Sequence, residues 1–165
     1  PILNRRRLES EAWRDAVLRV AGVLDDTMTG PSSNLDDAKN TRRTIYGRVS
    51  RQNVADVLRL FDFPDAKQHA EERLVTTTPL QQLYLLNSTF MQQCSTTLST
   101  LVKKMYRDDE DRFQALFRRT LQRDPTAAER HSALRLLASK SVKQDEAWKL
   151  MAHGLLASNE FLYVD

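Results

Sequence analysis

Four arginines on either side of one tyrosine are the clearest candidates for binding chemistry in this chain. The tyrosine is Tyr46, and the arginines are Arg42, Arg43, Arg48 and Arg51. Guanidinium groups form bidentate hydrogen bonds to carboxylate, phosphate or sulfate, and a tyrosine ring offers a stacking face. The spacing therefore predicts an anion-binding surface, to which we add Arg73 as a further candidate. The alternative is a solvated or salt-bridged face that binds no ligand.

Three acidic residues define an alternative site. Asp62 and Asp65 flank a Phe-Pro pair, and Glu160 lies near the end of the chain. Paired carboxylates can act as general acid and base on a glycosidic bond, which would make this a hydrolase. Aspartates around a proline in a turn also cap backbone amides, which is the simpler interpretation. We further expect Arg73 to form an ion pair with Asp62 or Asp65, tying the irregular segment 62–77 to the helices.

Metal, haem and nucleotide chemistry lack the residue spacing that each requires. The histidines, His69, His131 and His153, have no second histidine or cysteine at metal-ligand spacing. The sequence contains no Cys-x-x-Cys-His, Gly-x-x-x-x-Gly-Lys or Gly-x-Ser-x-Gly motif. The single cysteine, Cys94, lies in a helical pattern and is expected to be a buried, inert thiol. We therefore expect no metal site and no cofactor in this segment.

Composition places the chain among globular helical domains. Of its 165 residues, 41% are hydrophobic and 28% are charged, while Gly and Pro number only 4 and 5. This length predicts a single domain over residues 1–165. The net charge of +3 is small and no nucleic-acid-binding motif is present, so we expect no nucleic-acid partner. No apolar run approaches the roughly 18 residues that a membrane-spanning helix needs, so no transmembrane segment is expected.

Hydrophobic periodicity predicts an all-α fold, an irregular array of about six helices. The first helix is expected over about 5–25, with Asn4 as its N-cap. A long loop follows over 26–41. Residues 43–50 are the one segment where a short extended conformation competes with helix. Asn53 is then expected to cap a short helix.

Later helix starts carry clearer local signals. Thr78 precedes a proline, and Ser88 can cap the helix that follows. The acidic run 108–111 suits the positive N-terminal end of the helix that follows the one capped by Ser88. Thr126 begins a capping-box pattern. The apolar tail, residues 159–165, is expected to pack back onto the domain or onto a neighbouring one.

Several short motifs follow one another in a recognisable order over essentially the whole chain. They are Arg6-Arg7-Leu8-Glu9 with Glu11-Ala12 and Arg14-Asp15-Ala16, Gly30-Pro31, Arg43-Thr44-Ile45-Tyr46, Phe61-Asp62-Phe63-Pro64-Asp65, Thr76-Thr77-Thr78-Pro79-Leu80-Gln81 running to Leu86-Asn87-Ser88, Arg123-x-Pro125-Thr126 and Ser158-Asn159-Glu160-Phe161-Leu162-Tyr163-Val164-Asp165. On these motifs the chain resembles the C-terminal domain of unknown function of large planctomycete proteins that carry an N-terminal cytochrome c domain. One departure is Gly47 and Arg48, which stand where apolar residues are expected.

The resemblance implies an exported parent protein, located in the periplasm or secreted, whose haem lies only in the N-terminal region outside this segment. The chain begins on Pro1 without Met, which predicts an excerpt of a longer protein, and the resemblance implies that it is the C-terminal part. Our leading hypothesis is a non-enzymatic accessory domain with an anion-binding face. Its expected partners are the other domains of the parent chain and, as a further candidate, anionic polysaccharide. The alternative is part of a hydrolase acting on complex, sulfated polysaccharides.

Overall fold

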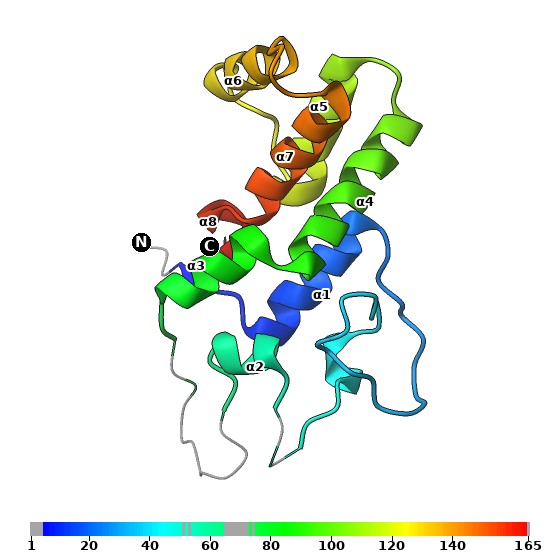
Figure 1. Ribbon diagram of the computed structural model, residues 1–165, viewed down its shortest axis with the longest axis vertical. Coiled ribbons are helices and arrows are strands. Elements are labelled where there is room, and N and C mark those ends of the chain that lie inside the picture. The colour runs from blue at the N-terminus through cyan, green and yellow to red at the C-terminus, as the bar shows by residue number, and fades with distance from the viewer. Residues whose placement is uncertain (1–4, 51, 53, 65–72, 74, 165) are drawn as a thin grey trace.

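The computed structural model describes residues 5–50, 52, 54–64, 73 and 75–164. Within them the regular secondary structure is mostly helical, and the single sheet of this part has two short strands (Figure 1). The longer helices are α1 Ser10–Ala21, α3 Pro79–Asn87, α4 Thr89–Met105, α5 Asp109–Leu121, α6 Ala127–Leu137 and α7 Gln144–Leu156. The short ones are α2 Asp56–Leu60 and α8 Asn159–Leu162. The all-α prediction is confirmed, and none of the described helices combines the length and apolar character needed to cross a membrane.

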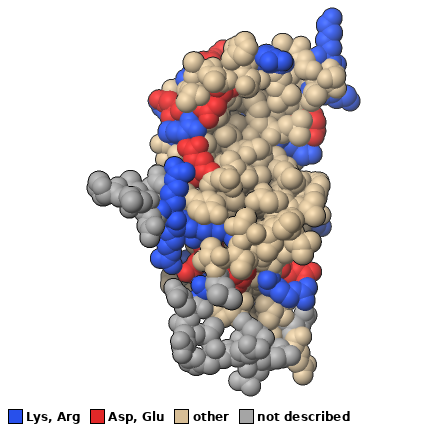
Figure 2. Space-filling view, turned by 90° about the vertical axis from the view of Figure 1, so that its left-hand side faces the viewer, with Lys and Arg blue, Asp and Glu red and all other residues tan. Residues whose placement is uncertain are grey.

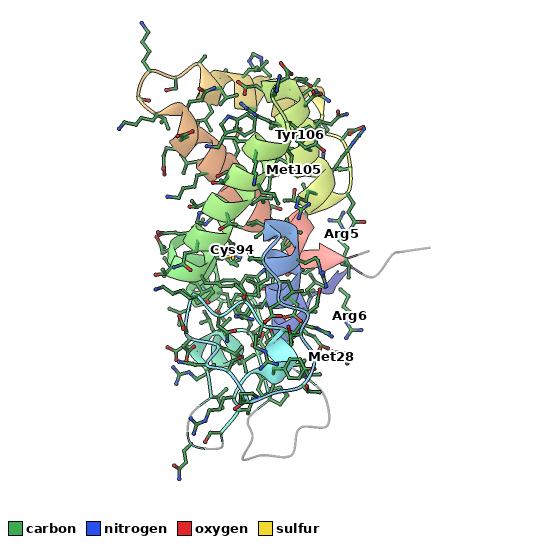
Figure 3. All side chains as sticks on the ribbon, turned by 90° about the vertical axis from the view of Figure 1, so that its right-hand side faces the viewer. Arg5, Arg6, Met28, Cys94, Met105 and Tyr106 are labelled. Carbon is green, nitrogen blue, oxygen red and sulfur yellow. The ribbon has the colours of Figure 1, made fainter. Side chains whose placement is uncertain are left out.

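Helix α4 is the centre of the hydrophobic core. It packs against α7 along most of its length and also contacts α1, α5 and α3. Met91, Leu98 and Val102 follow one another along its buried face, as the helical period requires. Cys94 lies on the same face and is buried (Figure 3), as predicted. Burial raises the pKa of its thiol to about 12, so the thiolate form is scarce at neutral pH.

The local signals for helix starts are confirmed. Thr78 and Thr126 each form a complete capping box with the residue three positions later. The Ser88 hydroxyl accepts a hydrogen bond from the backbone N–H of Met91, and Asp108 caps α5 in the same way. These caps satisfy backbone amides that have no partner inside the helix. The Asn53 cap predicted for α2 lies outside the described residues.

The N-terminal helix is shorter than predicted. Residues expected to form its first turn instead form strand β1, Arg6–Arg7, and α1 begins only at Ser10. Strand β1 pairs antiparallel with β2, Tyr163–Val164, and this long-range pairing competes successfully with local helix propensity. The helix ends at Ala21, because Gly22 has a φ of 77° that turns the chain so that the Val23 N–H donates to the Leu18 carbonyl at 3.0 Å. The helix therefore does not extend to 25.

The C-terminal tail packs back onto this domain, which confirms the first of the two expectations for it. Phe161 and Leu162 of α8 are buried in the core cluster. The backbone N–H of Leu8 donates to the Leu162 carbonyl at 2.8 Å, next to the β1–β2 pairing. The two ends of the described chain therefore lie together (Figure 1).

Of the helical and extended conformations left open for residues 43–50, the first half takes the helical one. Residues Thr44–Tyr46 form a 3-10 turn, and only Gly47 makes a single bridge, to Ser33. The turn forms because Asp15 of α1 accepts hydrogen bonds from both the N–H and the hydroxyl of Thr44, at 2.7 and 2.6 Å. The long loop between α1 and this turn is confirmed (Figure 1).

Candidate functional site

The loop that carries the predicted arginine cluster is anchored by Arg14 of α1. Arg14 is buried, and its guanidinium donates to the carbonyls of Asn40 and Arg42 at 2.5 and 3.0 Å and to the Thr44 hydroxyl at 3.2 Å. Burial lowers the pKa of the Arg14 guanidinium, against the opposing effect of the Asp15 charge. A buried charge is tolerable only with such partners. Arg14 is thus the support for the loop, and sequence reasoning did not identify it.

The guanidinium group of Arg42 is engaged in hydrogen bonds within the loop. Its guanidinium donates to the carbonyls of Thr29 and Pro31. The same group lies 4.5 Å from the centre of the Tyr46 ring, a cation–π contact. The Tyr46 hydroxyl in turn accepts a hydrogen bond from the Thr29 N–H at 3.1 Å. Arg42 and Tyr46 therefore hold the loop closed.

The remaining members of the cluster differ in their surroundings. Arg43 pairs with Asp15 at 3.5 Å, and its side chain is about half exposed. Arg48 is exposed, and the described part of the chain provides no ion-pair partner for it. Arg51 lies outside the described residues. The structure thus brings Arg42 and Tyr46 together in a cation–π contact, whereas the side chains of Arg43 and Arg48 are exposed to solvent.

Arg73 does not belong to this cluster, and the predicted pairing with Asp62 is wrong. Its guanidinium bonds both oxygens of Glu11, at 2.9 Å each, and Glu9 at 3.0 Å. Burial would raise the pKa of Glu11, but hydrogen bonds from Arg73 and Ser10 outweigh it and hold that pKa below its ordinary value. The two glutamates flank the start of α1, so Arg73 fastens its own segment to that helix.

Asp62 is committed to the backbone that precedes α3. Its carboxylate accepts from the N–H and the hydroxyl of Thr76, at 2.9 and 2.6 Å, and lies 3.6 Å from the guanidinium of the buried Arg7. This is the capping use of a turn aspartate. The second predicted acid, Asp65, lies outside the described residues.

Glu160 is held in an ion-pair network with Arg123 and Glu129. Arg123 donates to both oxygens of Glu160, at 2.6 and 2.8 Å, and to both oxygens of Glu129, at 2.9 and 2.8 Å. Hydrogen bonds from Arg123 lower the pKa of Glu160 and bring that of Glu129 to about 2. A general acid needs a pKa raised toward neutrality, so neither group is tuned to donate a proton.

A broad groove of about 930 Å³ lies between α1, α5 and the C-terminal tail. Its lining residues include three arginines, Arg5, Arg19 and Arg119, and the apolar Leu8 and Phe161. Arg5 lies at the edge of the molecule, next to the short sheet (Figure 3). Sequence reasoning missed this groove because its arginines come from three distant segments. Among the described residues, no cluster of three or more His, Cys, Asp or Glu could hold a metal ion.

Two of the groove arginines also close the end of α1. Arg19 forms two hydrogen bonds with the Asp26 carboxylate, at 2.8 and 2.7 Å. Arg119 of α5 donates to the Val20 carbonyl at 2.5 Å, which satisfies a helix-end carbonyl that has no partner within α1. Arg19 and Arg119 are therefore held by internal bonds, and the one carboxylate among the described lining residues, Glu160, is paired with Arg123.

Comparison with known proteins places the chain in a family. No curated protein and no solved structure matches it. The model of the family described as "Protein of unknown function (DUF1553)" matches residues 2–137, which is most of the chain. The match covers α1 to α6, including the arginine-supported loop and the segment that leads into α3. The chain therefore belongs to the DUF1553 family of proteins of unknown function.

Proposed function

We propose that this chain is a non-enzymatic accessory and interaction domain of an exported protein that also carries a cytochrome c domain. The observation that carries the proposal is the use of its acidic groups. Asp62 caps backbone, and Glu160 and Glu129 are paired with Arg123. Carboxylates engaged in this way stabilise a scaffold and are not available as general acid and base. The other domains of the parent chain are the partners we propose.

We also propose a small anion-binding face at Arg43 and Arg48. The 3-10 turn Thr44–Tyr46 separates the two residues, and Asp15 holds this turn to α1. Their exposed guanidinium groups suit the sulfate or carboxylate groups of an anionic polysaccharide. Because Arg43 already shares its charge with Asp15, Arg48 is the residue on which binding depends most.

The alternative, a hydrolase of sulfated polysaccharide, gains no support from the described carboxylates, and an activity assay separates the two. We expect no release of reducing ends when the chain is incubated with sulfated or neutral polysaccharide. Release above the blank that disappears in Asp62→Asn or Glu160→Gln would contradict the accessory role.

Thermal shift tests the anion-binding face. A ligand at about 100 times its Kd adds roughly 2.7 kcal/mol, which corresponds to a Tm rise of about 5–10 °C for a chain of this size. We expect a rise with a sulfated oligosaccharide, none with the neutral one, and a smaller rise at higher salt. Arg48→Ala should remove the rise, whereas Arg135→Ala, an exposed arginine of α6, should keep it. Equal shifts in these two variants would refute the assignment.

A further inference from the structure

The groove between α1, α5 and the C-terminal tail combines positive charge with apolar surface. Its volume of about 930 Å³ lies in the range of ligand-binding clefts. Its apolar lining includes Leu8, Val20, Leu121 and Phe161, which come from four separate segments of the chain. Of these, Phe161 is buried, and the other three are only partly buried against the core. The groove therefore keeps apolar side-chain surface available to a ligand.

The positive charge of the groove is not cancelled by its own acidic residue. Among the described lining residues the only carboxylate is that of Glu160, and Arg123 already donates to both of its oxygens. Arg19 shares its charge with Asp26. Arg119 is exposed and donates only to backbone carbonyls, and it forms no ion pair with a carboxylate of the described residues. A negatively charged ligand can therefore pair with Arg119 without displacing an internal ion pair.

Two side-chain amides in the groove are also unused. Gln122 follows the last residue of α5 and Asn159 is the first residue of α8, and both are exposed. Neither amide has a hydrogen-bond partner within the described part of the chain. Each offers N–H donors and a carbonyl acceptor, which are the groups that the C=O and N–H of a peptide backbone require.

Positive charge gathers on one edge of the molecule. Figure 2 shows a column of blue side chains along its left edge, below a mixed group of red and blue ones, whereas a broad area across the middle has neither colour. Figure 3 looks from the opposite side, so this edge is its right-hand edge, where Arg5 and Arg6 are labelled. Arg5 belongs to the groove lining. An anionic partner is therefore attracted to the edge that carries this part of the groove.

We propose that the groove binds an acidic peptide that also carries apolar side chains. The acidic side chains pair with Arg119 and Arg5, the apolar ones cover the partly buried lining, and the backbone bonds the free amides. A saccharide polyanion would leave the apolar lining uncovered, and a purely apolar partner would leave the arginines unpaired. The peptide is the partner that matches both. This inference is independent of the anion-binding face, because neither Arg43 nor Arg48 lines the groove.

Fluorescence anisotropy with labelled peptides tests the proposal. The probe is a peptide of about eight residues in which aspartate and leucine alternate, which spans about 26 Å when extended. Two comparison peptides keep one feature each: alternating aspartate and serine keeps the charge, and alternating asparagine and leucine keeps the apolar side chains. We expect the aspartate–leucine peptide to have a Kd at least about tenfold lower than either. Its binding should weaken as salt concentration rises.

Charge-removing variants locate the binding. Arg119→Gln should raise the Kd of the aspartate–leucine peptide by about threefold or more. Because this change also removes a bond to the Val20 carbonyl, the Tm is measured alongside. Arg5→Gln should raise the Kd in the same direction and leave the Tm unchanged, since Arg5 is exposed and lies outside the helices. The matched control is Arg135→Gln, an exposed arginine of α6 outside the groove, which should keep the Kd of the unaltered chain.

Three outcomes would overturn the proposal. One is the absence of binding by the aspartate–leucine peptide at concentrations up to about 1 mM. Another is equal binding by a comparison peptide: with aspartate–serine the groove would accept any polyanion, and with asparagine–leucine any apolar partner. The third is a Kd that the two groove variants and Arg135→Gln change equally or not at all.

Discussion

Gly47→Ala is expected to destabilise the chain through a clash with one side chain. A methyl group at Gly47 would lie 2.3 Å from Cδ1, 2.6 Å from Cγ and 2.9 Å from Cδ2 of Leu35, which is buried. Carbon atoms prefer about 3.5–4.0 Å, so Leu35 must move within a packed core. The φ of Gly47 is −64°, which any residue adopts, so the effect is one of space and not of backbone strain. This close approach is also the physical reason that a glycine stands here.

The magnitude follows from the cost of overpacking. An extra methyl group in a packed site costs about 1–3 kcal/mol. For a chain of this length each kcal/mol lowers Tm by about 2–4 °C, so calorimetry should show a fall of about 2–10 °C. The matched control is Gly154→Ala in α7, where an added methyl group meets nothing within 4 Å. Alanine favours helix over glycine by up to about 1 kcal/mol, so this second variant should be as stable as the unaltered chain or more stable.

A double-mutant cycle identifies the cause. Leu35→Ala alone should cost about 2–5 kcal/mol because it removes a buried side chain. In the double variant the new methyl group at position 47 no longer meets Leu35 and fills part of the vacated space. The two losses, measured by urea unfolding, should therefore sum to at least about 1 kcal/mol more than the loss in the double variant. Additivity within about 0.5 kcal/mol, or an unchanged Tm in Gly47→Ala, would refute the reasoning.

Three further variants test the ion pairs and the loop support. The pKa of Glu129 is about 2 in the folded chain against an ordinary 4.5, so its pairing with Arg123 stabilises above pH 4.5 and the benefit is lost as pH falls toward 2. Glu129→Gln should flatten this pH dependence of the urea midpoint, and an unchanged slope would contradict the pairing. Arg14→Ala should cost about 3 kcal/mol and speed amide exchange in the loop 22–43, and unaltered exchange there would show that the loop is held by other contacts. Arg73→Ala should lower Tm by about 1–4 °C through loss of its bonds to Glu11, and a variant as stable as the unaltered chain would remove that role.

The features that the sequence predicts well are those with local causes. A hydroxyl residue just before a helical pattern can accept a hydrogen bond from a backbone N–H of the first turn. Thr78, Ser88 and Thr126 stand at such positions, and each of them is an N-cap in the structure. The all-α class follows from periodicity for the same reason. The start of α1 could not be predicted in this way, because β1 forms by pairing with Tyr163–Val164 at the other end of the chain.

The candidate site shows the same limit more sharply. The cluster of arginines around Tyr46 in the sequence identifies the loop. It does not indicate which group each guanidinium bonds. Arg42 turns inward because the carbonyls of Thr29 and Pro31 need donors, and those carbonyls carry no sequence signature. Arg73 bonds Glu11 although Asp62 is nearer in the sequence, and the carboxylate of Asp62 is instead engaged with Thr76.

Many of the arginines therefore have a structural role, which is to donate hydrogen bonds to backbone carbonyls. Long irregular segments have backbone carbonyls without helix or sheet partners, and each must find a donor when buried. Arginines supply such donors from Arg7 to Thr76, from Arg14 to Asn40 and from Arg42 to Pro31. Arg112 and Arg119 donate in the same way to helix-end carbonyls, those of Tyr106 and Val20. A guanidinium suits this use because it offers five donors in a fixed plane. The donors of Arg42 are engaged with carbonyls in this way, so the anion-binding proposal depends most on the exposed Arg48.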